Sequence, residues 1–461
     1  MIVVVVLTLF LAFKQFIALV DILHFYRFHK RKTSKVPSVP KDNPTVIVVI
    51  PALLEQHIIA ETVSYFSAFR SIQIVIVTTE REEKLWVLPS TAEVLAGLAP
   101  AFSFVRVHFP YRQGTKADQL NYVAMRFSEL LPMHDAQNSF FAIYDADSRP
   151  HPRTFDQFIL SYASNRDRNI FQQSSVFYEN YDSLGSATTS KILKAFLRAQ
   201  AVLQTRFTVA YEIPRLLNQL EYYNKKLTWR SALGSLTYAH CVGHGLFVRV
   251  SFLQRVNFPA GSSVEDMFYG FILNCLNEPI TPIPILTNSE MPSTLSTLFF
   301  QRTRWFLGPA RFLTYLKYVR ANYSHLSSLT RCVVVSAFCF HNALNWALTS
   351  PIYLLINLAV LYTMASILIG RAGAVNWVVL FASFLVTLFY LVGLVLLLRN
   401  FSLTITFAGQ AQKRTTPRRH GFGVILTFPL VLLLHSIPAY YCIFSMLFGK
   451  AQIQYSKTDR S

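Results

Sequence analysis

The chain has 461 residues, more than one domain usually contains, so two or three structural units are expected. It carries 43 Lys and Arg against 24 Asp and Glu, a formal net charge of +19, and 52% of its residues are hydrophobic. The basic residues gather beside apolar segments at the two ends, and no nucleic-acid-binding motif is present, so membrane lipid and not nucleic acid is the expected partner.

The N-terminal segment, residues 1–26, is predicted to be a transmembrane helix. It is almost wholly aliphatic to Phe13 and, after Lys14, apolar again to Val20. A signal peptide carries its basic residues before the apolar core, whereas here a basic cluster follows it, between Arg27 and Lys35. The positive-inside rule then places the following region in the cytoplasm, and Lys14 must face another helix or reach the membrane surface.

Residues 36–300 have the composition of a soluble domain that opens with alternating strand and helix patterns. Strands are expected at 45–50, 73–79 and 140–144, and helices at 55–69 and 116–131. This alternation predicts an α/β domain with a mostly parallel sheet and helices on both faces.

The segment from Phe140 to Pro150 is an apolar strand that ends in two carboxylates, Asp145 and Asp147. Carboxylates at the C-terminal end of a strand in an open α/β sheet lie where ligands bind, and they suit a divalent cation that carries a diphosphate. In isolation, an ordinary turn after a strand is the commoner use of these residue types. Further segments support the site.

Two of these segments follow predicted strands or open a helix. Pro51 and Glu55 come after the first strand and Glu80 after the second, where a nucleotide base and ribose would lie; solvated acids are the alternative. Lys116 begins a helix after a small-residue turn and is placed to neutralise a diphosphate, although a surface lysine is the alternative.

Two more segments lie nearer the C-terminus. Glu265 and Asp266 enter an amphipathic helix, and Asp266 is a candidate general base for an acceptor hydroxyl; simple charge capping of the helix is the alternative. The sequence Gln301-Arg302-Thr303-Arg304-Trp305 offers a guanidinium for diphosphate and an indole face for a sugar, or else an anchor at the membrane interface.

The C-terminal part, residues 331–448, is predicted to cross the membrane several times. Cys332 to Ile369 is longer than one crossing requires, so either two spans turn at Thr349-Ser350-Pro351 or an interfacial helix leads into one kinked span. Further spans are expected at 377–398 and 421–448, for four or five crossings in all. The basic loop from Lys413 to Arg419 is expected to be cytoplasmic. The five cysteines lack metal-ligand spacing, which fits a reducing compartment.

In order, spacing and setting, these segments resemble the membrane-integrated synthases of glycosyltransferase family 2. That group includes cellulose, chitin, hyaluronan and poly-N-acetylglucosamine synthases, with ceramide glucosyltransferases more distant, and the resemblance covers about residues 46–305. It implies a cytosolic GT-A domain (α/β, Rossmann-like) at 36–300, flanked by transmembrane helices. Residues 301–330 would hold the Gln-x-x-Arg-Trp motif and an interfacial helix, and 449–461 a cytoplasmic tail. The protein would be a multi-pass protein of the plasma membrane, the inner membrane of a bacterium.

The resemblance also implies roles for individual residues. Asp145 and Asp147 would bind the diphosphate of a nucleotide sugar through Mg²⁺ or Mn²⁺, and Asp266, beside Glu265, would be the catalytic base. The remaining implied positions are the acceptor-facing turn at Gly243, His244 and Gly245, the motif residues Gln301, Arg304 and Trp305, and a strand glutamine at Gln172 or Gln173.

One position departs from the family pattern. Family members usually have an acidic Asp-Asp-Gly turn after the second strand, whereas this chain has Thr78-Thr79-Glu80, so Glu80 or Glu55 is expected to take that role. The terminal sequence from Tyr455 to Arg460 is similar to a Lys-Thr-x-Arg tail of some bacterial members.

The expected function is inverting transfer of a sugar, from a donor expected to be a UDP-sugar, to a hydroxyl of a growing polysaccharide, coupled to export. A single transfer to a membrane lipid is the alternative, and a transporter or scaffold with an inactive nucleotide-binding domain is a third.

Overall fold

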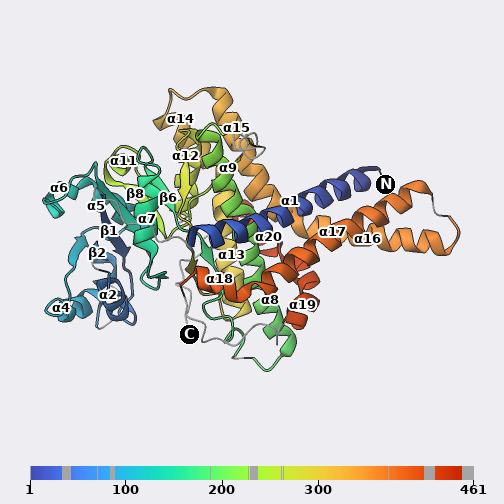
Figure 1. Cartoon of the computed structure of the whole chain (residues 1–461), viewed down its shortest axis with the longest axis horizontal. Helices are drawn as coiled ribbons and strands as arrows, with labels where there is room; N and C mark the ends of the chain where they lie inside the picture. The colour runs from blue at the N-terminus through green and yellow to red at the C-terminus, as the bar shows by residue number, and fades with distance from the viewer. Residues whose placement is uncertain are drawn as a thin grey trace.

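The computed structural model describes residues 2–33, 43–69, 71–83, 89–186, 188–226, 228, 237–260, 262, 264–371, 373–409 and 421–448. Figure 1 shows a sheet-containing domain on one side and a group of long helices that extends away from it on the other. The expected cytoplasmic loop at 413–419, the tail at 449–461 and the end of the N-terminal basic cluster lie outside the described residues.

The main sheet has seven strands in the order β3-β2-β1-β4-β8-β6-β9. In that order their bounds are Val105–Phe109, Ile72–Thr79, Thr45–Pro51, Ser139–Ile143, Leu246–Arg249, Ile170–Gln172 and Ile280–Pro282. Neighbouring strands run parallel, except that β8 is antiparallel to both β4 and β6. The prediction of a mostly parallel α/β sheet is therefore confirmed.

Strand β1 explains why the sheet is covered on both faces. Its sequence is Thr-Val-Ile-Val-Val-Ile-Pro, and all residues between the two ends are buried. A continuous β-branched run of this kind is typical of a strand with helices above and below it. Strands β2 and β4 flank it, and their chain connections leave in opposite directions, so the sheet has a topological switch point between β1 and β4.

Helices cover both faces, as predicted. One face packs against α2 (Ile59–Ser67), α4 (Thr91–Leu98) and α7 (Thr154–Ala163). The other packs against α5 (Lys116–Met125), α6 (Phe127–Leu130), α11 (Val250–Arg255) and α12 (Glu265–Cys275). The short helix α3 (Glu80–Glu83) follows β2, and a small sheet of β5 (Arg149–Pro150), β10 (Thr287–Asn288) and β7 (Ser175–Val176) lies at the domain's edge.

Two predicted helices differ from the observed ones. The helix expected from Glu55 begins only at Ile59, because Leu54 has a positive φ of 57° and the Glu55 amide donates to the Thr91 hydroxyl. The helix expected over 116–131 is divided into α5 and α6 at Arg126, whose ψ of 19° lies outside the helical region. The predicted start of a helix at Glu265 is confirmed.

The remaining elements form the helical part of the molecule. Their bounds are α1 Ile2–Thr33, α8 Lys191–Phe207, η1 Thr208–Glu212, α9 Ile213–Tyr223, α13 Leu295–Ala310, α14 Phe312–Asn322, α15 Ser328–Phe338, η2 Cys339–Leu344, α16 Asn345–Leu368, α17 Ala374–Arg399, α18 Phe401–Phe407, α19 Gly421–Leu434 and α20 Ile437–Leu447. Helix α1 packs along α17, α8 against α19, and α13 against α20. The segments η1 and η2 are π-helical and join their neighbours without a break.

Four helical segments of the described chain are long and apolar enough to cross a membrane: Ile2–Lys30, Ser328–Leu368, Ala374–Arg399 and Gly421–Leu447. The alternative of two spans turning at Thr349-Ser350-Pro351 is wrong, because these residues lie inside the continuous helix α16. The prediction that Lys14 faces another helix agrees with its contact with Asn345 Oδ1 on α16.

Candidate active site

The two aspartates of the strand-end motif lie at the switch point of the sheet. Asp145 and Asp147 follow β4, and Pro51 ends the neighbouring strand β1, so all three occupy the crevice where open α/β sheets bind ligands. The turn that carries the aspartates is tied to α2, because the Thr62 hydroxyl donates to the Ala146 carbonyl. The Ser148 amide also donates to the Asp145 carbonyl at 3.0 Å, which closes the turn. These bonds hold the backbone of the turn that carries both carboxylates.

Lys116 lies between Asp145 and the glycine turn at residues 243–245. It is the first residue of α5, whose start is capped by Asp118 accepting from the Thr115 amide at 2.6 Å. Its Nζ donates to Asp145 Oδ1 at 2.6 Å and also to the Gly243 carbonyl. Burial alone would lower the pKa of Lys116, but Asp145 and Glu265 outweigh it and raise the pKa, so the ammonium stays charged. Lys116 is therefore a fixed cation at the crevice.

The glycine turn allows the base candidate to approach that cation. A Cβ at Gly243 would lie 3.1 Å from Asp266 Oδ2 and 3.8 Å from Lys116 Nζ, so a larger residue there would crowd both groups. Gly245 has a φ of +66°, and a Cβ there would lie 2.8 Å from the Gln173 carbonyl. The turn therefore depends on glycine at both positions.

The two glutamines behind the turn are buried and hold it. Gln172 accepts from the Val242 amide at 2.9 Å and donates to the His244 carbonyl at 3.0 Å. Gln173 accepts from the Tyr144 hydroxyl at 2.7 Å and so ties β4 to the same turn. Both side chains are fully buried, so they position the turn without facing a ligand.

Glu265 and Asp266 occupy the first turn of α12 and face the crevice. Burial, followed by the charge of Asp266, raises the pKa of Glu265 to about 7. Burial also raises the pKa of Asp266, against the opposing effects of the Met267 amide, which donates to its Oδ1 at 2.7 Å, and of Lys116. Two adjacent carboxyl groups with raised pKa values next to a fixed cation are suited to accept a proton near neutral pH.

His244 points toward a pair of serines. Its Nε2 contacts the hydroxyl of Ser175 and lies 3.4 Å from that of Ser289. Burial lowers the pKa of His244 despite the nearby Asp145 carboxylate, which favours the neutral imidazole. The structure therefore places His244 on the side of the site formed by the small sheet.

The Gln-x-x-Arg-Trp motif lies inside α13. Gln301, Arg304 and Trp305 are three and four residues apart, so they share one side of the helix. The single interfacial helix expected within residues 301–330 is divided in two at Arg311, between the end of α13 and the start of α14. Between the motif residues, Arg302 is 7% exposed, and its guanidinium carbon lies 5.4 Å from the centre of the Trp305 ring.

A cavity of about 1790 Å³ joins these groups. Most site residues predicted from the sequence line it, whereas Glu80, Gly245, Gln172 and Gln173 are not on its wall. From the sheet crevice the cavity continues between the long helices, where its walls include Lys14, Arg206 and Asn345. The motifs of the soluble domain and the candidate membrane spans therefore border one continuous space.

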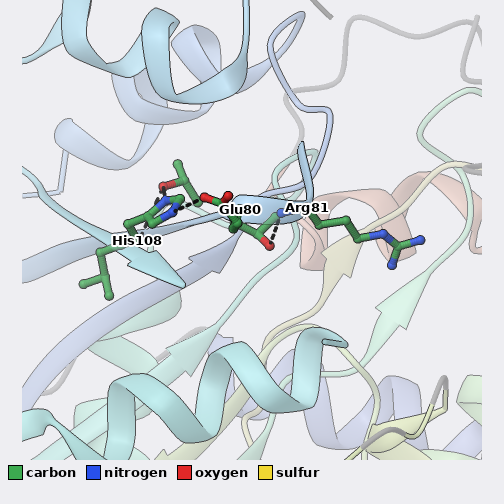
Figure 2. A network of polar contacts seen from close by, with 6 residues as sticks. Glu80, Arg81 and His108 are labelled. Carbon is green, nitrogen blue, oxygen red and sulfur yellow. Dashed lines mark hydrogen bonds and ion pairs between the residues drawn. The ribbon is translucent and has the colours of Figure 1, made fainter. Parts of the chain in front are cut away.

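Glu80 was predicted to contact the nucleoside, but the structure does not bring it to the cavity wall. It lies 3.4 Å from His108 Nε2, and the Nδ1 of the same ring lies 3.3 Å from the Thr78 hydroxyl. Figure 2 shows Arg81 extending away from the Glu80–His108 pair, and Arg81 does line the cavity. Glu55, the alternative for the missing acidic turn, is also on the wall.

Sequence reasoning missed Glu82, which anchors the loop after β1. Its carboxylate accepts from the Leu54 amide at 2.8 Å and from the Thr91 amide at 2.6 Å. Glu82 is 3% exposed, so it supports the loop that carries Glu55 and does not face a ligand. Glu82 is one of three acids in the run Glu80-Arg81-Glu82-Glu83, and no sequence pattern distinguishes it from the other two.

The sequence patterns also did not predict the side chains that η1 and its neighbours bring to the cavity. Arg206, Tyr211 and Glu212 line the wall between the sheet domain and α1. Burial raises the pKa of Glu212 to about 7. The charged residues Arg206 and Glu212 within a long amphipathic segment could have indicated a functional position. However, a π-helical turn changes the face on which a residue lies, and it has no clear sequence pattern.

The candidate donors for a metal ion are the carboxylates of Asp145 and Asp147. Among the described residues, no group of three or more His, Cys, Asp or Glu side chains could hold a metal ion. Mg²⁺ in nucleotide sites is commonly held by one or two carboxylates together with phosphate oxygens and water. Two carboxylates at the mouth of the crevice fit an ion that arrives with a diphosphate, and they do not fit an all-protein cage.

Comparison with known proteins gave the following results. A family model described as "Glycosyltransferase like family 2" matches residues 44–308, which is more than half of the chain. Among solved structures, the chain is similar to the mannosyltransferase PcManGT from Pyrobaculum calidifontis in complex with GDP-Man and Mn²⁺. The identity is 15% and the TM-score 0.37, and the match covers 86% of this chain and 98% of that one. None of the curated proteins matches.

Proposed function

The chain belongs to the glycosyltransferase like family 2, and on this premise we propose that it transfers a sugar, with inversion, from a nucleotide sugar to a hydroxyl held in the membrane-facing cavity. The observation that carries the proposal is the convergence of Lys116, Asp145 and Asp266 around Gly243. A fixed cation, a metal-binding carboxylate and a base candidate thus meet where the sheet crevice opens into the cavity.

The donor occupies the crevice at the ends of β1 and β4. Asp145 and Asp147 would hold Mg²⁺ or Mn²⁺, which supplies positive charge for the diphosphate leaving group. Lys116 adds a second cation there, and its salt bridge with Asp145 keeps its ammonium in place. Pro51, Glu55 and Arg81 lie on the wall where the nucleoside fits, and a UDP-sugar is the donor we propose to test first.

Asp266 takes the proton in the transfer step. The acceptor oxygen forms a bond to the anomeric carbon, its proton passes to the Asp266 carboxylate, and the bond between that carbon and the diphosphate oxygen breaks with its electron pair on the leaving group. A single displacement inverts the configuration, so an α-linked donor gives a β-linked product. Burial and the charge of Asp266 raise the pKa of Glu265 to about 7, so Glu265 stays protonated in mildly acidic solution while Asp266 is ionised and available as the base.

The acceptor enters from the helical side of the cavity. Trp305 offers a ring face for a sugar, and Gln301 and Arg304 lie on the same side of α13. A growing polysaccharide that leaves between the helices is the first candidate, with export coupled to synthesis. A membrane lipid that receives one sugar is the second, and it is favoured by the aliphatic residues that line the cavity between α1 and α16.

We propose the following membrane arrangement. Residues 1–26 form the N-terminal span, 36–300 the cytoplasmic catalytic domain, 301–330 the motif and an interfacial segment, 331–448 the C-terminal spans and 449–461 a cytoplasmic tail. The boundary at 301 falls inside α13, so the motif helix belongs to both parts. The four candidate spans support a multi-pass protein, and the plasma membrane is the proposed location.

A donor panel tests this function. The purified full chain is incubated with UDP-, GDP- and other nucleotide sugars in Mg²⁺ or Mn²⁺, with membrane lipid present. Release of nucleoside diphosphate identifies the donor, and the mass of the product then separates a polymer from a singly modified lipid. Absence of release with every donor, from protein that keeps its thermal unfolding transition, would contradict the proposal and favour an inactive scaffold.

A further inference from the structure

Two basic side chains line the cavity on its membrane side, far along the chain from the donor motifs. Lys14 comes from the candidate span α1, and Arg206 comes from α8 just before the π-helical turn η1. A third, Arg215 on α9, lies behind the wall and contacts the cavity-lining His341. These residues are called here the cationic cluster.

Among the described residues, the hydrogen-bonding partners of the cationic cluster are neutral. Arg206 donates to Gln15 Oε1 at 2.6 Å and lies 3.4 Å from the Tyr211 hydroxyl. Arg215 lies 3.2 Å from His341 Nδ1, and Lys14 donates to the Asn345 side chain. Within the described part of the chain, none of the three forms an ion pair with a carboxylate.

The cluster retains unused donors in a buried place. Arg206 is 3% exposed and its Nε has no hydrogen-bond partner among the described residues, and the same holds for one terminal nitrogen of Arg215, which is 8% exposed. The Arg206 guanidinium stacks on the Tyr390 ring at 4.4 Å, but stacking uses its face and leaves its N–H edge available.

The positive charges of the cluster change the pKa of the neighbouring Tyr211. Burial on its own raises the pKa of a tyrosine, yet Arg206 and Lys14 outweigh burial and lower the pKa of Tyr211. The carboxyl group of Glu212 interacts with Arg215. Burial raises the pKa of Glu212 to about 7, so near neutral pH its partial negative charge offsets at most part of one positive charge of the cluster. The cluster therefore keeps an excess of positive charge.

An excess of buried positive charge requires a counterion. A buried ion without an opposite charge is costly, and buried arginines commonly pair with carboxylate or phosphate. Arg302 adds to the excess, because it is 7% exposed, lines the same cavity and has two nitrogens without partners in the described structure. A neutral glycan offers no charge to match this wall.

We propose that the cationic cluster binds the phosphate of a membrane lipid that enters between the long helices. The walls around the cluster favour a lipid over a free anion, because α1 contributes Leu7 and Leu11 and α16 contributes Ile352 to the same cavity. An amphiphile would place its chain along these residues and its phosphate at Lys14 and Arg206. Identification of this lipid as the sugar acceptor rests on the proposed function, whereas the phosphate site itself does not.

A matched pair of probes tests the site. Binding of farnesyl phosphate and of farnesol, which differ only in the phosphate, is measured by native mass spectrometry of the full chain in neutral detergent with EDTA. We expect farnesyl phosphate to bind about tenfold more tightly, the factor that one charge-assisted contact supplies. Arg206→Gln should remove most of this difference and leave farnesol binding unchanged.

Controls separate the alternatives. Lys191→Gln removes an exposed charge from the same helix and should change neither affinity. Lys14→Gln is the second test variant if Arg206→Gln does not fold. Equal affinity of the two probes in the wild type would overturn the phosphate site, and binding of inorganic phosphate as tight as that of farnesyl phosphate would overturn the lipid assignment. Tighter binding of a glucuronate oligosaccharide than of farnesyl phosphate would also overturn the lipid assignment and would indicate an acidic glycan as the ligand.

Failure of this inference can be told apart from failure of the proposed function. The Asp266→Asn variant should lose transfer but keep the preference for farnesyl phosphate. A wild type that releases nucleoside diphosphate from a nucleotide sugar without preferring farnesyl phosphate would refute the inference alone. A wild type with that preference and no transfer from any donor would refute the function alone.

Discussion

The sheet end and the membrane end of the cavity differ in how their charges are paired. At the sheet end, Lys116 bonds to Asp145 and lies near Glu265 and Asp266, so charges of both signs stand together. At the membrane end, the hydrogen-bond partners of Lys14 and Arg206 within the described structure are neutral. The sheet end is thus largely organised before a substrate binds, whereas the membrane end has charge left for a ligand. Variants at the two ends should accordingly separate chemistry from acceptor binding.

The largest effect is expected at Asp266. Replacing it with Asn should lower transfer by about 10²–10⁴-fold, because the acceptor proton then has no base to receive it. Donor binding should persist, since Lys116, Asp145 and Asp147 are unchanged. The measurement is nucleoside diphosphate release, together with the rise in thermal stability that the donor produces. Asp156→Asn, an exposed aspartate on α7, is the matched control; wild-type activity in Asp266→Asn would sink the assignment.

The second-largest effect is expected at Asp147, the proposed metal ligand at the sheet end. Asp147→Ala should weaken metal-dependent donor binding by at least about tenfold, since loss of a direct ligand costs no less than loss of its supporting group. Titration of the nucleotide with and without Mg²⁺ measures it. If affinity in the variant still rises with Mg²⁺ as in the wild type, Asp147 is not a ligand and the metal lies elsewhere.

A smaller effect concerns pH and the acidic pair. Burial raises the pKa of Glu265 from 4.5 to about 7 in the folded protein, so the folded state holds its proton over a range where the unfolded chain has lost it. The unfolding free energy should therefore fall as pH rises from about 4.5 to about 7, and then level off. Melting scans across this range should show the midpoint falling by a few degrees, about 2–4 °C.

Glu265→Gln provides the control for this effect. The variant has no titrating group at that position, so the fall in melting temperature should shrink. The rise of its transfer activity with pH should match that of the wild type, because Asp266 is the first of the pair to ionise and Glu265 is still neutral there. A variant whose melting temperature falls with pH as steeply as that of the wild type would show that Glu265 does not cause the pH dependence.

How much the sequence could predict also differs between the two ends. The strands β1, β2 and β4 and the residues just after them were found, because apolar runs and nearby acids are patterns contained within a few residues. The start of α12 was found for the same reason. Lys14 was noticed, but its neighbours Arg206 and Tyr211 were not, because they meet it only when α1, α8 and η1 pack together. No pattern within one helix carries that information.

Glu80 shows the limit of a local pattern at the sheet end itself. An acid after the second strand suggested a contact with the nucleoside, yet the carboxylate lies beside His108, on the strand next to it, and off the cavity wall. Position along a strand gives the edge of the sheet, but the direction of the side chain depends on α3, which begins at Glu80. The neighbouring Arg81 is the residue of this turn that reaches the cavity.

The smallest expected effect follows from this placement. Glu80→Gln should change donor affinity by no more than about fivefold, since it removes a partly exposed pair of a kind that contributes about 1 kcal/mol or less. Glu55→Gln, on the cavity wall, should weaken donor binding more, because a carboxylate that bonds a ribose hydroxyl makes a charge-assisted contact. Nucleotide titrations of both variants decide between them. The opposite ranking would mean that donor binding turns Glu80 toward the crevice, and that the sheet end is less fixed in advance than its salt bridge indicates.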